Sequence, residues 1–381
     1  MMTKLPLMPM GQQGLDTWTA REDLPLSKLA VLKNVRARRG KLETSPGTTS
    51  FVTPLVTGRP LKFLWWQLDN LTEILNLATT SKLYNFNTTT LAFDDITHAA
   101  GNYTGGSGNF WDACASNNQA IFTNNIDALQ MVDGTGAVAT DLGGTPPTTA
   151  AAVAAFQTYL LAGNVAGSVR KIQWTNSGVN NDWTTGDAGN LTLFQDPGPI
   201  YRLLPLGETL VAYRPLSIHI LFFVGSPFIF AQRQILTGLG PIGPRAMASL
   251  GERHIYWGRE GILLFDGARR EHVGHDVFDA MMTAVDPQFL TSVQAFVNQK
   301  DREVYFAYPG AGDNGVCKNA FVYNYQEGTW REDAFTVAAA GPWRRFSTVA
   351  WNAAVGTWAA SPFSWLEYVT TTDASPVVLI G

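Results

Sequence analysis

Five basic side chains stand close together near the start of a chain that otherwise carries few charges. They are Lys33, Arg36, Arg38, Arg39 and Lys41, which fall within nine consecutive positions. The whole chain has only 15% charged residues and a formal net charge of −4 at pH 7. A local excess of positive charge suits contact with an acidic protein surface or with the phosphates of passing DNA. A solvated hairpin whose charges guard a sheet edge is the other interpretation, and both stay open here.

Two histidines and their acidic neighbours form the next group with chemical potential. His272 and His275, with Asp266 and Asp276 beside them, contain metal-ligating side chains. Their HxxH spacing differs from the HExxH spacing that puts two zinc ligands on one helix face. We therefore expect a structural or solvated role for these residues, with no metal site and no cofactor.

Carboxylates are the groups that a glycosidase needs in pairs. The candidates are Asp94, Asp95, Glu252 and Glu260. The sequence has no GxxxxGK[ST] phosphate loop and no GxSxG nucleophile turn. Whether any of these acids can act together depends on the elements that position them.

A strand signal followed by a turn recurs along the whole chain. Its members centre on Tyr84, Phe122, Leu160, Val211, Tyr256 and Tyr305, at steps of 38, 38, 51, 45 and 49 residues. Repeats of about 40–50 residues with four short strands are typical of propeller blades. Residues 206–213 and 250–257 are the clearest internal copies. The sequence therefore predicts an all-β fold, a six- or seven-bladed β-propeller.

The predicted inner strands decide between an enzyme and a scaffold. We expect them at 153–156, 201–206, 245–250 and 292–298, and they contain almost no acidic residues. Propeller glycosidases bring their carboxylates together near the axis, on such strands. We therefore expect no enzymatic activity, and a carbohydrate-binding or glycan-cleaving propeller is the alternative from another functional class.

Two segments of the chain need a separate secondary-structure prediction. Residues 276–284 have apolar residues on one helical face and are followed by Pro287, which predicts a short helix. The alanine-rich segment 146–159 suits either a helix or an inner strand, where small residues fit near the axis. The repeat spacing favours the strand.

The N-terminal region is expected to be distinct from the blades. Residues 1–28 are rich in proline and predict an extended arm, in which Leu15, Trp18 and Leu24 are apolar anchors for a neighbouring protein. Residues 29–47 begin with a predicted strand at 29–35 and turn at Gly40. We expect this N-terminal strand to complete the last blade, because closure removes a free sheet edge. Residues 29–381 then form one propeller domain.

Composition narrows the cellular context. Cys114 and Cys317 lie far apart in no motif, which argues against a disulfide framework or a zinc site. The first 13 residues lack the continuous apolar core of a secretory signal. The longest apolar stretch, around 218–224, is too short to span a bilayer. We expect assembly in the cytoplasm and no membrane insertion.

Short motifs follow one another in a characteristic order along the chain. They are LKNVRARRGKLETSPG at 32–47, KIQWTN at 171–176 with NNDW at 180–183, GSPFIF at 225–230, GILLFDG at 261–267, and YNY at 323–325 with GTW at 328–330. In order and spacing, over residues 29–335, they resemble those of phage tail proteins with a β-propeller core. These are the tail nozzle, or tail tubular protein B-like, family of short-tailed phages.

The resemblance implies a structural virion protein rather than an enzyme. Nozzle proteins form a ring, most often a homohexamer, below the portal and adaptor proteins. The ring extends the channel through which phage DNA leaves, and it carries tail fibre or tail plug proteins. The basic segment and the arm would then be interface or DNA-path elements, and the protein would be located in the virion tail after assembly in the host cytoplasm. Nozzle propellers often carry a platform domain for which this chain has little room, so a propeller adaptor or other structural ring protein elsewhere in the virion is the alternative.

Overall fold

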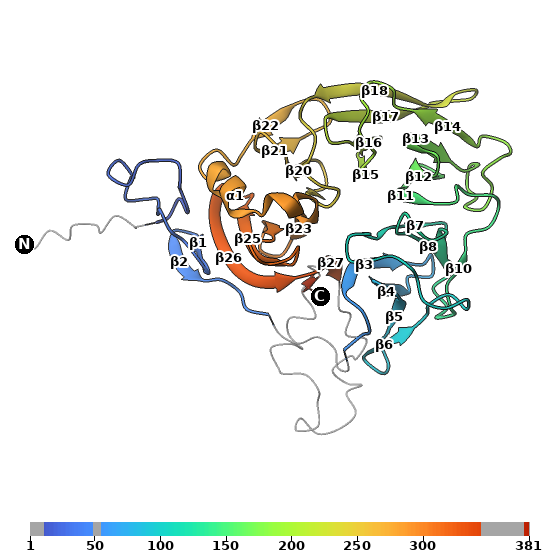
Figure 1. Cartoon of the computed structure of the whole chain (residues 1–381), viewed down its shortest axis with the longest axis horizontal. Helices are drawn as coiled ribbons and strands as arrows, with labels where there is room; N and C mark the ends of the chain where they lie inside the picture. The colour runs from blue at the N-terminus through green and yellow to red at the C-terminus, as the bar shows by residue number, and fades with distance from the viewer. Residues whose placement is uncertain (1–10, 49–54, 344–376, 381) are drawn as a thin grey trace, which may run out of the picture.

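The computed structural model describes residues 11–48, 55–343 and 377–380, and its architecture is all-β. Six four-stranded antiparallel sheets surround a central axis as the blades of a propeller (Figure 1). The predicted β-propeller is therefore confirmed, with six complete blades in the described part of the chain. Within each blade the strands follow in sequence from the axis outwards.

The first three blades occupy residues 60–192. Blade one consists of β3 (Pro60–Gln67), β4 (Glu73–Thr79), β5 (Leu83–Asn87) and β6 (Ala92–Asp95). Blade two consists of β7 (Asp112–Ser116), β8 (Gln119–Thr123), β9 (Gln130–Val132) and β10 (Thr140–Asp141). Blade three consists of β11 (Ala150–Phe156), β12 (Tyr159–Val165), β13 (Ser168–Trp174) and β14 (Gly189–Thr192).

The remaining three blades occupy residues 202–337. Blade four consists of β15 (Arg202–Leu206), β16 (Thr209–Tyr213), β17 (Ser217–Gly225) and β18 (Ile229–Thr237). Blade five consists of β19 (Met247–Ser249), β20 (His254–Trp257), β21 (Ile262–Phe265) and β22 (Arg270–His272). Blade six consists of β23 (Gln294–Asn298), β24 (Glu303–Tyr308), β25 (Cys317–Asn324) and β26 (Thr329–Val337).

One helical connection separates blades five and six. It contains the helix α1 (Phe278–Ala284) and the 3-10 helix η1 (Pro287–Ser292), so the expected short helix is confirmed. Val277 and Met281 are fully buried against blades five and six, which explains the apolar face. Within the described ranges, no helix is long and apolar enough to cross a membrane.

The hydrophobic core lies between neighbouring blades. Between blades four and five, Val211 and Tyr213 of β16 pack with Met247 and Tyr256 of the next blade. Ala152 and Ala154 of β11 are buried against blade four, with Leu203 in the same cluster. The alanine-rich segment is thus the strand that the spacing favoured, because small side chains allow close packing near the axis.

The sequence repeat follows one strand in five of the blades. Its later members all lie on second strands, namely Phe122, Leu160, Val211, Tyr256 and Tyr305. Tyr84 instead lies on β5, the third strand of blade one. The first step of 38 residues therefore connects a third strand, β5, with a second strand, β8. The repeat could not distinguish β5 from the true second strand β4, because both are apolar.

A two-stranded sheet fills the space between blades six and one. β27 (Ala340–Trp343) pairs antiparallel with β28 (Val377–Ile380). A Cβ atom added at Gly341 would lie 2.6 Å from the Cβ of Phe63 on β3, so β27 packs closely against blade one. On its other side, Ala340 packs with the cluster that contains Phe296 of blade six. The ring joint is made by this pair of strands.

The N-terminal segment joins blade six at its outer edge instead of at the ring joint. The predicted strand at 29–35 is wrong in its bounds, because the strand β1 spans Val35–Arg38 and pairs with β2 (Lys41–Thr44). Before β1, Lys33 forms a single parallel bridge with Glu332 of β26. The chain therefore does add to the last complete blade, as a bridge followed by a hairpin. Figure 1 shows this hairpin outside β26.

Candidate functional site

The predicted basic segment forms ion pairs with blade six. Lys33 Nζ lies 3.2 Å from Glu332 Oε1. Arg36 Nη1 and Arg38 Nη1 lie 3.3 Å and 3.1 Å from Asp301 Oδ1, and Arg36 Nε donates to Glu43 at 2.7 Å.

The other two basic residues, Arg39 and Lys41, have exposed side chains at the turn of the hairpin. The backbone N–H of Arg39 donates to the Glu327 carboxylate at 3.1 Å. Arg39 and Lys41 are therefore the two of the five basic residues that form no ion pair within the described part of the chain.

A buried charge network lies beneath the hairpin. Arg331 donates two hydrogen bonds to the Glu303 carboxylate at 2.6 and 2.9 Å, and a third to Asp333 at 2.9 Å. Burial opposes the charge, but these bonds outweigh it and raise the pKa of Arg331. Ser45 Oγ, just after β2, donates to Asp333 at 2.6 Å. The hairpin thus covers one side of a paired, desolvated cluster.

The interpretation of the segment as a solvated hairpin is therefore wrong for Arg36 and Arg38, which are partly buried in ion pairs, whereas Lys33 is exposed and pairs at the surface. Arg36 pairs locally with Glu43 of β2, but the other acidic partners come from β24, β26 and the turn between β23 and β24, which a local sequence pattern cannot reveal. Replacing Arg36 and Arg38 is consequently expected to destabilise the fold, because Asp301 would lose its cationic partners.

The predicted arm also packs on the propeller in the part that the structure describes. Leu15 is buried in the core of blades five and six, and its N–H donates to Trp330 O at 2.8 Å. Asp16 accepts from Lys28 Nζ at 2.9 Å, and that ammonium also contacts Asp276 at 2.7 Å. The expectation of an unpacked arm is wrong for residues 11–28, because these bonds and Leu15 tie it to the chain's own blades.

The other two predicted anchors of the arm differ in exposure. Trp18 is 59% exposed and touches His275 edge-on, with ring centroids 4.9 Å apart. Leu24 is half-buried. Of the three anchors, Trp18 is the one that remains open to a partner.

The histidine and carboxylate candidates do not converge. His272 Nε2 lies 3.2 Å from the Glu260 carbonyl oxygen, while Asp276 pairs with Lys28 and Asp266 caps a turn at Ala268 and Arg269. Asp94 and Asp95 lie on the outer strand β6, and Glu252 and Glu260 are exposed in turns. Among the described residues, no three His, Cys, Asp or Glu side chains come together as a potential metal site.

The central channel of the propeller contains a partly open cavity of about 250 Å³. Residues of blades one, two, three, four and six, of the segment just before blade five, and of β27 line it. The charged lining residues are Lys62 of β3, Asp112 of β7, Arg202 of β15, and Arg245 just before β19. The sequence did not predict this site. Arg202 and Arg245 lie in two of the predicted inner strands, but that prediction considered only the acidic residues of those strands.

Asp112 is the partner of two of these cations. Its Oδ1 lies 3.1 Å from Lys62 Nζ and 3.9 Å from Arg202 Nε, and its Oδ2 accepts from the Val153 N–H at 3.2 Å. Burial lowers the pKa of Lys62, while the charge of Asp112 opposes that effect. Asp112 is the single carboxylate that lines the cavity, so the carboxylate pair of a glycosidase is not present there among the described residues.

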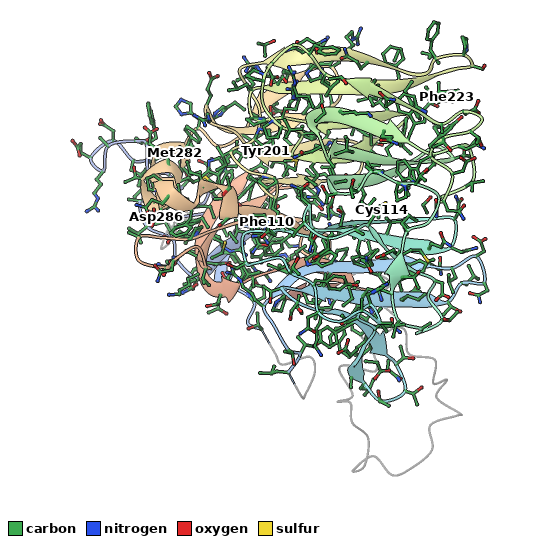
Figure 2. All side chains as sticks on the ribbon, turned by 45° about the vertical axis from the view of Figure 1, so that its right-hand side comes forward. Phe110, Cys114, Tyr201, Phe223, Met282 and Asp286 are labelled. Carbon is green, nitrogen blue, oxygen red and sulfur yellow. The ribbon has the colours of Figure 1, made fainter. Side chains whose placement is uncertain are left out.

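A second exposed feature is the long hairpin of β17 and β18, which extends from blade four (Figure 1). At its tip the exposed apolar side chains are Phe222, Phe223, Val224 and Phe228, of which Phe228 is 75% exposed. Figure 2 shows Phe223 near this tip, at the outside of the molecule and far from Phe110 and Tyr201 of the channel. The motif GSPFIF at 225–230 covers this tip, but the sequence did not predict that its apolar side chains are exposed.

Comparisons with known proteins identify related shapes only. No family model and no curated protein matches the chain. The computationally designed Ika8 protein is similar at 11% identity over 75% of this chain and 91% of its own, with a TM-score of 0.42. The Neurospora crassa Pan2 WD40 domain is similar at 10% identity over 74% and 82%, with a TM-score of 0.44. U3-55K is similar at 9% identity over 85% and 96%, with a TM-score of 0.48. None of the three is described as a virion protein, and the propeller assignment stands on the chain's own six sheets.

Proposed function

We propose that this protein is a non-catalytic structural subunit that assembles with copies of itself into a ring, a hexamer, as the tail nozzle of a phage virion. The ordered motifs of residues 29–335 support the virion role. In this role the ring lies below the portal and adaptor proteins, extends the DNA exit channel, and carries tail fibre or plug proteins.

The observation that carries the ring is the presence of two exposed apolar surfaces on different sides of the propeller. The hairpin tip is formed by Phe222, Phe223, Val224 and Phe228. The N-terminal segment, residues 11–48, exposes four large apolar side chains, Trp18, Leu26, Val31 and Leu42. Figure 1 places these segments at blade four and outside blade six. A ring is built by head-to-tail contact between two different surfaces, and exposed apolar patches mark such contacts.

The DNA path in this proposal runs through the middle of the ring of subunits. A cavity of about 250 Å³ in the propeller's own channel holds only a small molecule. Arg39 and Lys41 are the exposed basic residues of the hairpin, so they are the ones available to passing phosphates. Their contribution would weaken as the salt concentration rises.

The mass of the particle in solution tests the proposal. We expect the chain to form a closed ring, seen by light scattering and by cryo-EM class averages, with an opening wide enough for duplex DNA. A Val224→Ser, Phe228→Ser double variant should remain monomeric with an unchanged melting temperature, because both side chains are exposed at the hairpin tip. Ile126→Ser, an exposed apolar position on blade two, is the matched control and should still assemble.

Two results would contradict the proposal. One is an unaltered chain that stays monomeric at concentrations of tens of micromolar, where an interface of standard size would form. The other is a double variant that assembles as well as the Ile126→Ser control.

A further inference from the structure

Positive charge is in excess in the central channel. Lys62, Arg202 and Arg245 are three cations, and Asp112 is the single carboxylate, which leaves a net charge of +2 along the lining. The chain as a whole is poor in charge and negative. Placing uncompensated cations in a mostly buried position is unfavourable unless something neutralises them.

The carboxylate of Asp112 is already fully used. One oxygen faces Lys62 and Arg202, and the other accepts the Val153 N–H. Arg202 Nη1 donates in addition to the carbonyl of Met247 at 3.4 Å. Asp112 therefore balances one of these two cations and has no capacity left for Arg245.

Arg245 has only neutral partners in the part of the chain that the structure describes. Nη1 donates to Ala338 O at 3.0 Å and to Gln294 Oε1 at 3.3 Å, and Nη2 donates to Ser292 O at 3.3 Å. Its Nε is buried without a hydrogen-bond partner. Burial, together with repulsion from Arg59 and Arg202, lowers the pKa of Arg245 to about 10, so it stays charged at neutral pH.

The guanidinium of Arg245 is also held in a defined orientation. It lies over the ring of Phe110, with its central carbon 3.8 Å from the ring centroid. Stacking on Phe110 and three hydrogen bonds to neutral oxygens fix the guanidinium, while among the described residues its charge is not neutralised and one Nη2 N–H is not donated. The geometry thus provides a positioned, uncompensated cation beside the partly open cavity of the channel.

We propose that the central channel binds one small oxyanion of about two negative charges, of the phosphate or dicarboxylate class, with Arg245, Arg202 and Lys62 as its cationic partners. The cavity of about 250 Å³ has room for such an ion with a few waters, each of which takes about 30 Å³. It is smaller than the pockets of about 300–1,000 Å³ that hold drug-sized ligands. Because these side chains come from blades one and four and the start of blade five, the bound anion would also hold the blades together at the axis. The site is independent of ring assembly and would exist in the monomer.

Calorimetric titration of the intact chain with sodium phosphate, and separately with sodium malonate, tests the site. Both are compared with sodium chloride at the same ionic strength. We expect saturable binding of one anion per chain and a rise in melting temperature that chloride does not produce. Binding of phosphate alone assigns a phosphoryl ligand, and binding of malonate alone assigns a dicarboxylate. The proposal is overturned if neither anion shows saturable binding at concentrations up to about 10 mM. A dissociation constant above that concentration corresponds to a binding free energy weaker than about 3 kcal/mol.

Two substitutions locate the binding in the channel. Arg202→Gln should weaken the anion at least tenfold, because it removes one of the cations while Lys62 still neutralises Asp112. Arg233→Gln is the matched control, since Arg233 is exposed on β18 far from the channel. Arg245→Gln should abolish anion binding if this variant folds. If it does not fold, the affinity of Arg202→Gln alone decides the test. Equal affinity in the Arg202→Gln and Arg233→Gln variants would place the anion elsewhere and overturn the assignment.

Discussion

His254 shows how completely single side chains are specified inside the propeller. It is fully buried on β20, with Nε2 at 3.0 Å from Pro205 O and Nδ1 at 2.9 Å from the Tyr213 hydroxyl. The carbonyl can only accept, so Nε2 carries the proton and Nδ1 accepts from Tyr213. Burial lowers the pKa of His254 to about 4, an effect that the bond to Pro205 partly opposes.

This pKa predicts a pH-dependent stability. The unfolded chain binds a proton at His254 below its ordinary pKa of 6.5, whereas the folded chain does so only below about 4. The free energy of unfolding should therefore fall as the pH drops from 6.5 to 4, by roughly 2–3 kcal/mol from this residue. Urea unfolding at several pH values measures it, and in His254→Gln the fall should be smaller by that amount. An identical pH profile in the variant would show that His254 titrates normally in the fold.

At the residue scale, the sequence identified the basic and apolar residues of the N-terminal segment but not the residues that they contact. The basic segment was recognised from its composition, yet Asp301, which pairs with Arg38, lies 263 positions further along the chain. The exposure of Trp18 and the burial of Leu15 could not be separated either, since both are apolar residues in a proline-rich segment. Only the folded blades bring Trp330 to Leu15.

At the scale of elements, the N-terminal hairpin β1–β2 is a docked unit. Its arginines reach Asp301, and its end reaches Asp333 through Ser45. The sequence pattern predicted a strand, a turn at Gly40 and a return strand, and the turn is confirmed. The strand bounds were wrong because residues 29–32 look like a strand by composition but make only isolated backbone bonds, to residues 14, 16 and 332.

We expect an Arg36→Gln, Arg38→Gln double variant to be less stable by about 1–3 kcal/mol, because Asp301 would lose both cationic partners in a mostly buried position. Arg39→Gln, on the same turn with an exposed side chain, is the control and should change the stability by less than about 0.5 kcal/mol. Thermal unfolding with hydrogen exchange of residues 11–48 measures both. Equal stability of the two variants would mean that the ion pairs to Asp301 contribute nothing to docking.

At the scale of the whole molecule, the repeat spacing predicted the architecture well and the ring joint poorly. Blade-forming segments have strong local signals, since apolar strands alternate with Gly- and Asn-rich turns. The joint has none: β27 is the four residues AGPW, whose pairing with β28 and packing against Phe63 are long-range. The repeat gave the number of blades only as six or seven because the last expected blade, around residues 355–358, is poorly patterned, and that segment lies outside the described residues.

Gly341→Ala tests the joint directly. The new Cβ would lie 2.6 Å from the Cβ of Phe63 and 3.3 Å from its carbonyl oxygen, so β27 and β3 would have to separate. We expect a loss of about 1–3 kcal/mol in the free energy of unfolding. Gly47→Ala is the control, because no atom lies within 4 Å of its added Cβ and its φ is not positive. If Gly341→Ala is as stable as Gly47→Ala, the joint between β27 and β3 is not closely packed.

The position of the ring joint and of the N-terminal bonds sets an order of events on the ribosome. Blades one to five can fold in turn as the nascent chain emerges, because each is built from consecutive strands. The face of β3 that packs against β27 cannot be covered until residue 340 has been synthesised, and Leu15 cannot form its bond until Trp330 has been synthesised. Both apolar surfaces stay uncovered during almost the whole of translation, which is when such surfaces aggregate or recruit chaperones. The protein is therefore most vulnerable while it is being made, and slowing translation after blade one would lengthen that exposure.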